Sequence, residues 1–149
     1  MLDFRNPTNV HTPIGPYSHT AVVPSGTELI YLSAQLGIRP DGSTPTSIAE
    51  QADQVFANIV ALLGAHGLEP SSIVKLLTFL VAGQNGQAVL DAKRKHLGTH
   101  RPAATAVYVP QLVDPKWLVE VEAIAARGCT RCATRGSDGP DGRVAPHDS

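Results

Sequence analysis

The chain has 149 residues, 42% of them hydrophobic and 17% charged, with a net charge of −1. This composition is typical of one globular domain and excludes a disordered chain. The near-neutral charge and an aromatic content of 5% argue against a polyanion or base-stacked partner, so no nucleic-acid partner is expected. No apolar run approaches the roughly 20 residues of a membrane span, and no signal peptide is visible, so we expect a cytoplasmic protein without a membrane partner.

The first half of the chain predicts two strands and one long helix. Residues 1–18 are expected to be irregular because prolines are spaced through them. Strands are expected at residues 19–23 and 28–34, and a helix at residues 47–66. Ser47 and Glu50 form a capping box, in which the hydroxyl accepts from the Glu50 amide and the carboxylate reaches back to the backbone. Gly67 fits the left-handed stop of this helix.

The second half predicts three more strands and a second helix. Strands are expected at residues 72–81, 103–109 and 117–125, and a helix at residues 87–97, closed by Gly98. The order β-β-α-β-α-β-β predicts an α+β domain over residues 1–127, in which both helices pack on one face of an open sheet. Residues 128–149 have a single large aliphatic side chain, which predicts a disordered tail.

The last strand predicts a sheet with two different faces. Its alternate residues form a smooth surface for a helix to cover: Val119, Val121, Ala123 and Ala125. The opposite face carries Leu118, Glu120, Glu122 and Ile124. Two helices can cover only one face, and an uncovered apolar face in a soluble protein is usually a subunit interface. The pattern therefore predicts an oligomer without fixing the number of subunits.

Glu120 and Glu122 are the strongest candidates for chemistry. They lie about 6–7 Å apart along one strand face, and two carboxylates can take separate acid and base roles. A charged edge that faces solvent, or one that pairs with a Lys or Arg, is the alternative. His19 follows the turn Gly15-Pro16 and could stand with Tyr17 at a pocket mouth, although ordinary loop anchoring explains it as well.

The remaining histidines, cysteines and clustered basic residues are not expected to form a metal, redox or nucleic-acid site. His96 and His100 have helical spacing but no flanking carboxylate motif, so no metal is expected there. Cys129 and Cys132 form a C-x-x-C pair in a segment without the strand and helix of a redox motif, and are interpreted as incidental. The basic run 93–95 is interpreted as a solvated helix face.

Several short segments together resemble one known family. They are Gly15-Pro16-Tyr17-Ser18-His19, Ser33-Ala34-Gln35, Gln51 through Asn58, Pro102-Ala103, and residues 119–125. In order, they are similar to the G-P-Y-S-Q entry, the S-G-Q segment, the Q-x-x-x-x-x-x-N helix, the start of the P-A-R signature and the closing V-E-I-E-A-I-A of Rid/YjgF proteins. The match runs through about residues 10–127 at near-family spacing.

The resemblance implies a fold and a function. It implies a chorismate-mutase-like fold in a homotrimer, with the sheets forming a central barrel and pockets between subunits. It also implies hydrolysis of small reactive imines and enamines, such as 2-iminoacids, as small-molecule substrates and without a cofactor. By motif, Tyr17 and Ser33 would line the pocket and Glu120 would hold or polarise a water.

One motif residue does not carry over. The Arg of P-A-R, which the resemblance assigns to the substrate carboxylate, is Ala104 here, and the Cys that often follows is Ala106. Losing a bidentate, charge-assisted clamp costs on the order of 2–4 kcal/mol of binding free energy, so a standard 2-iminoacid substrate is not expected. Arg101 could swing inward as a substitute. Thr105 and His19 could still offer neutral hydrogen bonds.

Three functions from different classes remain open. The first is an enzyme that deaminates or tautomerises a small imine or enamine, with Glu120 activating water, Tyr17 and Ser33 holding the substrate, and His19 assisting proton transfer. The second is a non-catalytic trimer that binds a small metabolite or a partner protein, which the missing Arg favours. The third is a ribonuclease, which the near-neutral charge and the few aromatic residues disfavour.

Overall fold

The computed structural model describes residues 1–128 of the chain. The elements are β1 (Asp3–Arg5), β2 (Thr20–Val22), β3 (Glu28–Leu36), α1 (Ile48–Ala65), a 3-10 turn (Pro70–Ser72), β4 (Ile73–Val81), α2 (Gly86–Leu97), β5 (Ala103–Val109) and β6 (Val119–Arg127). Residues 129–149, which include Cys129, Cys132 and nearly all of the predicted tail, lie outside the described residues. Within the described part, neither helix is long and apolar enough to cross a membrane.

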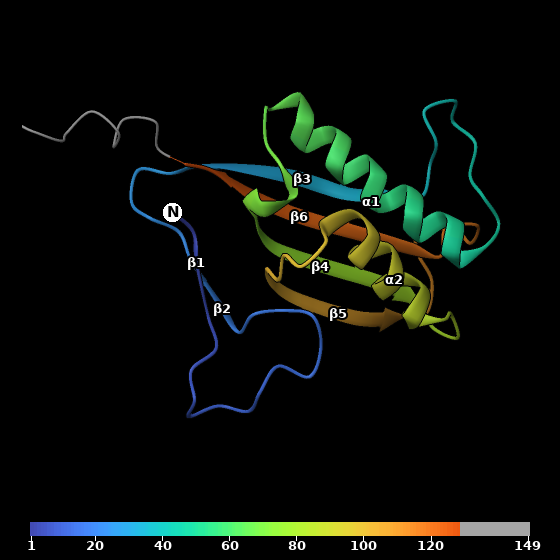
Figure 1. Cartoon of the computed structure of the whole chain (residues 1–149). Helices are drawn as coiled ribbons and strands as arrows, with labels where there is room; N and C mark the ends of the chain where they lie inside the picture. Colours follow the sequence, from blue (N-terminus) through green and yellow to red (C-terminus); the bar gives the residue numbers. More distant parts are fainter. Residues whose placement is uncertain (129–149) are drawn as a thin grey trace, which may run out of the picture.

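A four-stranded sheet with two helices on one side forms the body of the molecule (Figure 1). The strand order is β3-β6-β4-β5, so β3 and β5 are the two edges. The pairs of β6 with β3 and with β4 are antiparallel, and β4 and β5 are parallel because α2 connects them. The predicted α+β class and the placement of both helices on one face are confirmed.

Helix α1 begins and ends where its capping residues predict. The Glu50 amide donates to the Ser47 hydroxyl at 3.2 Å, and Gly67 has a φ of +68°, which the left-handed stop requires. The Glu50 carboxylate does not reach the backbone. It accepts instead from the Ser47 hydroxyl at 2.8 Å, so the predicted reciprocal bond is replaced by a side-chain bond.

The hydrophobic core lies between the helices and one face of the sheet. The predicted smooth face of β6 is fully covered, since Val119, Val121 and Ala125 have no exposed surface. Helix α1 packs on β3 and β6 and against α2. Its fully or nearly fully buried side chains are Gln51, Ala52, Val55, Phe56, Ile59 and Leu63.

Two sequence predictions were wrong in detail. Residues 1–18 are not entirely irregular, because Asp3–Arg5 pairs with Thr20–Val22 in a separate two-stranded sheet, and β2 therefore does not join the main sheet. The last strand runs from Val119 to Arg127, two residues later than expected. The Arg127 guanidinium holds this extension by donating to the Glu28 carboxylate at 2.9 Å and to the His66 carbonyl at 2.8 Å.

The chain after β3 passes directly over the start of α1. A side chain added at Gly37 would place its Cβ 2.7 Å from the Gln51 Cα and 2.8 Å from the Gln51 carbonyl oxygen. Backbone atoms cannot move aside as a flexible side chain can. Gly37 is therefore required by this close approach.

We predict that Gly37→Ala lowers the free energy of unfolding by about 2–3 kcal/mol, because the new methyl group overlaps backbone atoms of α1. Gly64→Ala is the matched control. It adds the same methyl group inside α1, where no atom beyond its chain neighbours and the nearby backbone of the helix lies within 4 Å, and should stabilise the helix by about 0.5–1 kcal/mol. Urea denaturation of both variants measures the difference. Equal stability would mean that the two segments do not approach this closely.

Candidate active site

A cavity of about 390 Å³ lies at the β5 edge of the sheet, next to α2. Its walls come from the loop 14–17, from α2, from β4, and from residues on both faces of β5. Most of the lining is apolar, including Leu76, Leu80, Val89 and Val107. Concave apolar sites with a few polar groups are the usual form of a small-ligand pocket.

Ser18 fixes the loop that brings Tyr17 to this cavity. Its hydroxyl donates to the Arg101 carbonyl at 2.7 Å, and its amide donates to the Pro102 carbonyl at 3.1 Å. Ser18 also forms a parallel bridge with Ala103, the first residue of β5. Because Ser18 is only 6% exposed, these bonds are largely shielded from water. Tyr17 is thereby held against the cavity as part of its lining.

Small side chains of β5 form one wall of the cavity. The register with β4 places Ala104 opposite Leu76 and Ala106 opposite Thr78, and all four residues line the cavity. These alanines stand where the family pattern has Arg and often Cys. Thr105 is also part of the lining, although its hydroxyl accepts a hydrogen bond from the Lys75 ammonium at 2.9 Å.

Lys93 contributes a cation to the cavity from α2. Its ammonium donates to the Pro16 carbonyl at 2.7 Å. Burial, and secondarily the nearby Arg101 charge, lower the pKa of Lys93 to about 8. Among the residues that the structure describes, Lys93 is the one charged side chain in the cavity lining.

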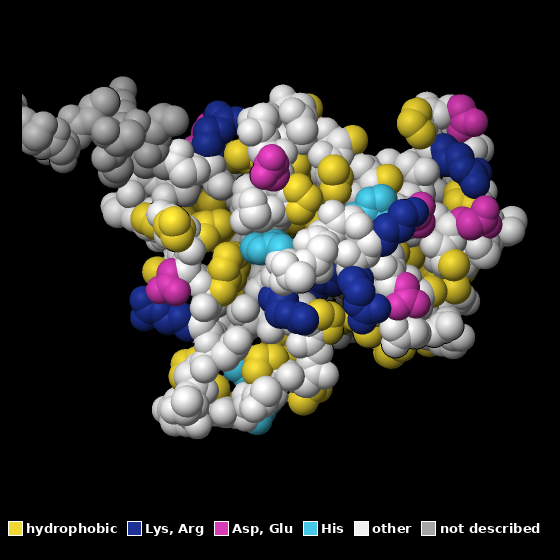
Figure 2. Space-filling view, viewed as in Figure 1, with side chains coloured by type: hydrophobic (Ala, Val, Ile, Leu, Met, Phe, Trp, Pro, Cys, Tyr) yellow, Lys and Arg dark blue, Asp and Glu magenta, His cyan; other side chains and the backbone are white. Residues whose placement is uncertain are grey.

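The sequence interpretation of the basic run 93–95 was wrong for Lys93. On the helix-covered face, Lys and Arg side chains gather over the α2 region (Figure 2). Arg94 and Lys95 are exposed there and pair with Asp91 and Asp53. Lys93 instead continues a stripe four residues after Val89 and four before Leu97, both buried. That spacing is the signal that could have identified it.

Ser33 and Glu120 lie away from the cavity. Glu120 is on the uncovered face of the sheet, in register with Leu36 of β3 and Phe79 of β4. Ser33 is exposed at the irregularity that interrupts β3 between Leu32 and Gln35. Ser33 is on the edge opposite β5, and Glu120 is on the interior strand β6, so within one chain neither residue joins Tyr17 in the cavity lining.

His19 and Arg101 stand near the loop but outside the cavity lining. The His19 Nε2 is 2.6 Å from the His11 carbonyl oxygen, and its ring lies edge-to-face with the Tyr17 ring at 5.7 Å. Arg101 is exposed and lies close enough to lower the pKa of Lys93. These two residues frame the approach to the loop without lining the cavity itself.

The two helical-spaced histidines serve the fold separately. The His96 Nε2 lies 2.8 Å from the Asp53 carboxylate, and the His100 Nε2 lies 2.8 Å from the Ile73 carbonyl oxygen. The hydrogen bonds from Lys95 and His96 lower the pKa of Asp53. Within residues 1–128, no group of three or more His, Cys, Asp or Glu side chains could hold a metal ion.

Comparisons with known proteins agree with these motifs. The family model described as Endoribonuclease L-PSP matches residues 8–127. The chain belongs to the Rid/YjgF family. It is 36% identical over 118 residues to the 2-iminobutanoate/2-iminopropanoate deaminase of Capra hircus, covering 77% of this chain and 82% of that protein. The crystal structure of the YjgF gene product of E. coli has a TM-score of 0.62 and 32% identity, over 77% and 91% of the two chains.

A further structure supports the fold alone. The Rid family protein YyfB of Yersinia pestis has a TM-score of 0.76 at 24% identity, and the match covers 85% of this chain and 98% of that chain.

The two polar residues of the helix motif, Gln51 and Asn58, hold the end of β3 and the segment before β6. The Asn58 amide donates to the carbonyls of Leu36 and Ile38, at 3.1 and 3.0 Å, and so holds the end of β3. Gln51 donates to the carbonyls of Pro45 and Lys116, both at 2.8 Å, and thereby ties the start of the helix to the segment before β6.

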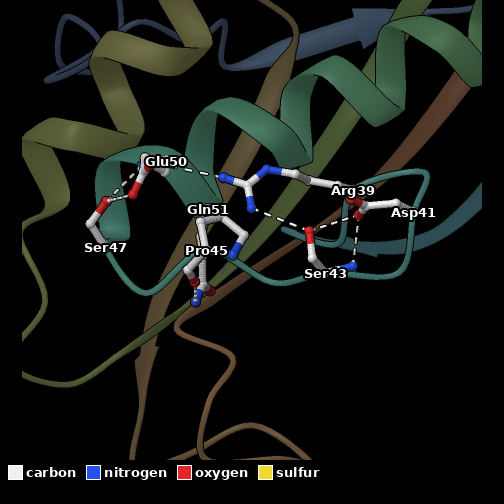
Figure 3. Close-up of polar contacts among 7 residues, drawn as sticks. All are labelled: Arg39, Asp41, Ser43, Pro45, Ser47, Glu50 and Gln51. Carbon is white, nitrogen blue, oxygen red and sulfur yellow. Dashed lines mark hydrogen bonds and ion pairs between the residues drawn. The ribbon is translucent and has the colours of Figure 1, made fainter.

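The loop that delivers the chain to this helix is held by its own polar contacts (Figure 3). The Arg39 guanidinium donates to the Ser43 hydroxyl at 3.3 Å and pairs with the Glu50 carboxylate at 3.7 Å. The Ser43 amide and hydroxyl donate to the Asp41 carboxylate, at 2.9 and 2.7 Å, and these bonds lower the pKa of Asp41. These contacts fix the conformation of the loop that leads to Ser47.

We predict that Ser18→Ala destabilises the protein by about 1–2 kcal/mol, because the shielded Arg101 carbonyl loses its donor. The melting temperature should fall by roughly 3–6 °C. Ser72→Ala is the matched control: its hydroxyl also donates to a carbonyl, that of Glu69, but in an exposed position where water replaces it. Equal shifts in the two variants would contradict the role given to Ser18.

Proposed function

We propose that the chain is an imine or enamine deaminase-type hydrolase that works as a homotrimer, without a cofactor, on a small molecule held between two copies. The names of the relatives support the reaction class, since the curated protein from Capra hircus is a 2-iminobutanoate/2-iminopropanoate deaminase. The cavity, with Tyr17 and Lys93 as polar groups in an apolar wall, supports a small-molecule ligand.

The separation of the predicted site residues within one chain is the observation that carries this proposal. Tyr17 lies with the cavity at the β5 edge, whereas Ser33 is at the β3 edge and Glu120 is on β6. The uncovered sheet face presents large apolar side chains, among them Tyr31, which is 71% exposed, and Val107, which is 40% exposed. An exposed apolar face of this kind favours association. A second copy that covers it would bring its own Ser33 and Glu120 toward the cavity.

The chemistry follows from the residues at that junction. The Glu120 carboxylate would accept a proton from water as the water oxygen attacks the imine carbon. It would return this proton to the nitrogen, which gives a carbinolamine, and would then carry the hydroxyl proton to the same nitrogen. The C–N bond breaks, ammonia leaves, and a carbonyl product remains. Tyr17 and Ser33 would hold the substrate by their hydroxyl groups, and His19 would assist proton transfer. Positioned general acid–base groups of this kind typically contribute 10²–10⁴-fold to the rate.

The residues of β5 bear on the choice of substrate. Ala104 offers neither charge nor donor where the family pattern has an Arg, so the bidentate clamp for a 2-iminoacid carboxylate is missing from this wall. We therefore propose a substrate other than a standard 2-iminoacid. Imine–enamine tautomerisation is the alternative reaction. It needs the Glu120 carboxylate to move a proton, but it needs no residue that binds a carboxylate of the substrate.

We predict that Glu120→Gln lowers the rate of enzyme-dependent imine loss by at least 100-fold. Imines would be generated in situ by amine and amino-acid oxidases, with and without a carboxylate, and followed as semicarbazones. Glu122→Gln is the matched control, since Glu122 lies two residues away on the same face of β6. Unchanged turnover in Glu120→Gln would remove the proposed mechanism.

Ala104 also favours a second candidate, a non-catalytic trimer that binds a small metabolite or a partner protein. In that case no imine in the panel would be consumed by the wild type, although a ligand would still raise the melting temperature by binding the folded state.

We predict that a Tyr17→Phe chain and a Glu120→Gln chain, inactive alone, regain activity when co-expressed. If each site takes Tyr17 from one copy and Glu120 from the next, mixed assemblies contain some sites with both wild-type residues. Light scattering of the purified mixture checks the assembly, and imine turnover checks the site. The control pair is a wild-type chain co-expressed with a chain that carries both substitutions. In this pair, only the sites formed between two wild-type copies should be active. No recovery in the first pair would place both residues in the same chain's site.

A further inference from the structure

The cavity holds a cation without an anion. Lys93 has no ion-pair partner in the part of the chain that the structure describes, and its single hydrogen bond goes to the neutral Pro16 carbonyl. An ammonium group has three donor hydrogens, so two remain for a ligand. Burying a cation without a counter-ion is unfavourable, which makes the cavity receptive to an anion.

The neighbouring charges do not satisfy this need. On α2 itself, Asp91 pairs with Arg94. On α1, Asp53 is held by Lys95 and His96. The segment before β5 adds a second cation, Arg101, whose charge lowers the pKa of Lys93 rather than supporting its charge.

The ionisable groups that line the cavity from the other elements are both phenols: Tyr17 from the loop and Tyr108 from β5. No carboxylate belongs to the cavity lining within residues 1–128.

The walls around Lys93 indicate the rest of the ligand. Ala104 and Ala106 leave room on β5, and Leu80 of β4 with Val89 and Leu90 of α2 adds apolar surface. One cation in such a setting matches a singly charged carboxylate better than a phosphate, which carries more charge than one ammonium can balance. The apolar surface matches a hydrocarbon or aromatic body.

We propose that this cavity is a binding site for amphiphilic monocarboxylates, in which the Lys93 ammonium holds the carboxylate and the apolar body lies against Ala104 and Ala106. The inference rests on the proposed function where it names a substrate class: an imine whose carboxylate is separated from the C=N group by an apolar body. The carboxylate of such a substrate would bind Lys93 on α2 and would not need a cationic residue on β5. The binding itself does not depend on any turnover.

Lys93 could instead serve only to anchor the loop through Pro16, and the experiment separates the two roles. The probes are 3-phenylpropanoate and its neutral isostere 3-phenylpropanamide, neither of which contains a C=N bond. Their dissociation constants would be measured by calorimetry for the wild type, Lys93→Met, Lys93→Arg and Arg94→Met. Arg94→Met removes the same charge from the next residue of α2, which does not line the cavity.

The expected result is a wild type that prefers the acid over the amide by about 10- to 100-fold, the range of a charge-assisted hydrogen bond. Lys93→Met should lose that preference while retaining its affinity for the amide. Lys93→Arg should keep most of the preference, and Arg94→Met should match the wild type. If Lys93→Met loses affinity for the acid and the amide equally, Lys93 only anchors the loop and the proposal is overturned. A wild type that binds neither probe would also overturn it.

A pH series gives an independent readout. Because the ammonium must be charged to hold the carboxylate, acid affinity should be constant below neutral pH. It should fall toward tenfold per pH unit above the pKa of Lys93, about 8 in the free protein. Amide affinity should stay constant across the same range. The Lys93→Arg variant should lose the pH dependence of acid binding, since a guanidinium remains charged throughout. An acid affinity independent of pH in the wild type would contradict the assignment.

Discussion

The fully buried carboxamide of Gln51 is the interaction on which the arrangement of the site depends. Its nitrogen donates to the carbonyls of Pro45 and Lys116, and its oxygen accepts from the Leu118 amide, each at 2.8 Å. The side chain therefore joins the start of α1 to the segment that enters β6. Each backbone group left without its partner in this dry position would cost about 1–3 kcal/mol. Gly37 lies directly against the same residue, which fixes the exit of β3 as well.

From that junction follows the position of Glu120, two residues after Leu118 on the uncovered face of the sheet. The strand order separates it from the cavity, because β4 lies between β6 and the β5 edge. The helices supply their apolar surface to one face only, and the other face retains apolar residues such as Tyr31, Phe79 and Val107. The same asymmetry that leaves this face uncovered also separates Glu120 from Tyr17. Under the proposed function, association of copies through this face would therefore also complete the site.

Periodic features were predictable from the sequence, and features set by strand order were not. The stripe and the caps of α1 predicted its bounds to within one residue, and the alternation of Val119 with Glu120 predicted which face is covered. The three-residue strand Asp3–Arg5 escaped prediction because three residues are too few to show a pattern, and its partner, which the sequence did predict as a strand, is about seventeen residues away. The separation of Ser33 from Tyr17 follows from β3 and β5 being opposite edges, which no local pattern contains. Lys93 escaped because a run of three basic residues was interpreted as a unit, although only one of the three continues the buried stripe.

The replacement of a β5 guanidinium by an α2 ammonium changes the kind of recognition that the cavity can provide. A guanidinium presents a planar fork that selects the orientation of a carboxylate and remains charged at any physiological pH. An ammonium is a point charge on a flexible stem, which accepts a carboxylate from several directions and loses its charge as the pH rises above a pKa that burial has lowered. Ala104 and Ala106 add volume on the wall where the fork would stand. A cavity built in this way selects for the apolar body of its ligand more strongly than for the geometry of its carboxylate, which is the reverse of what a guanidinium clamp on a small 2-iminoacid would achieve.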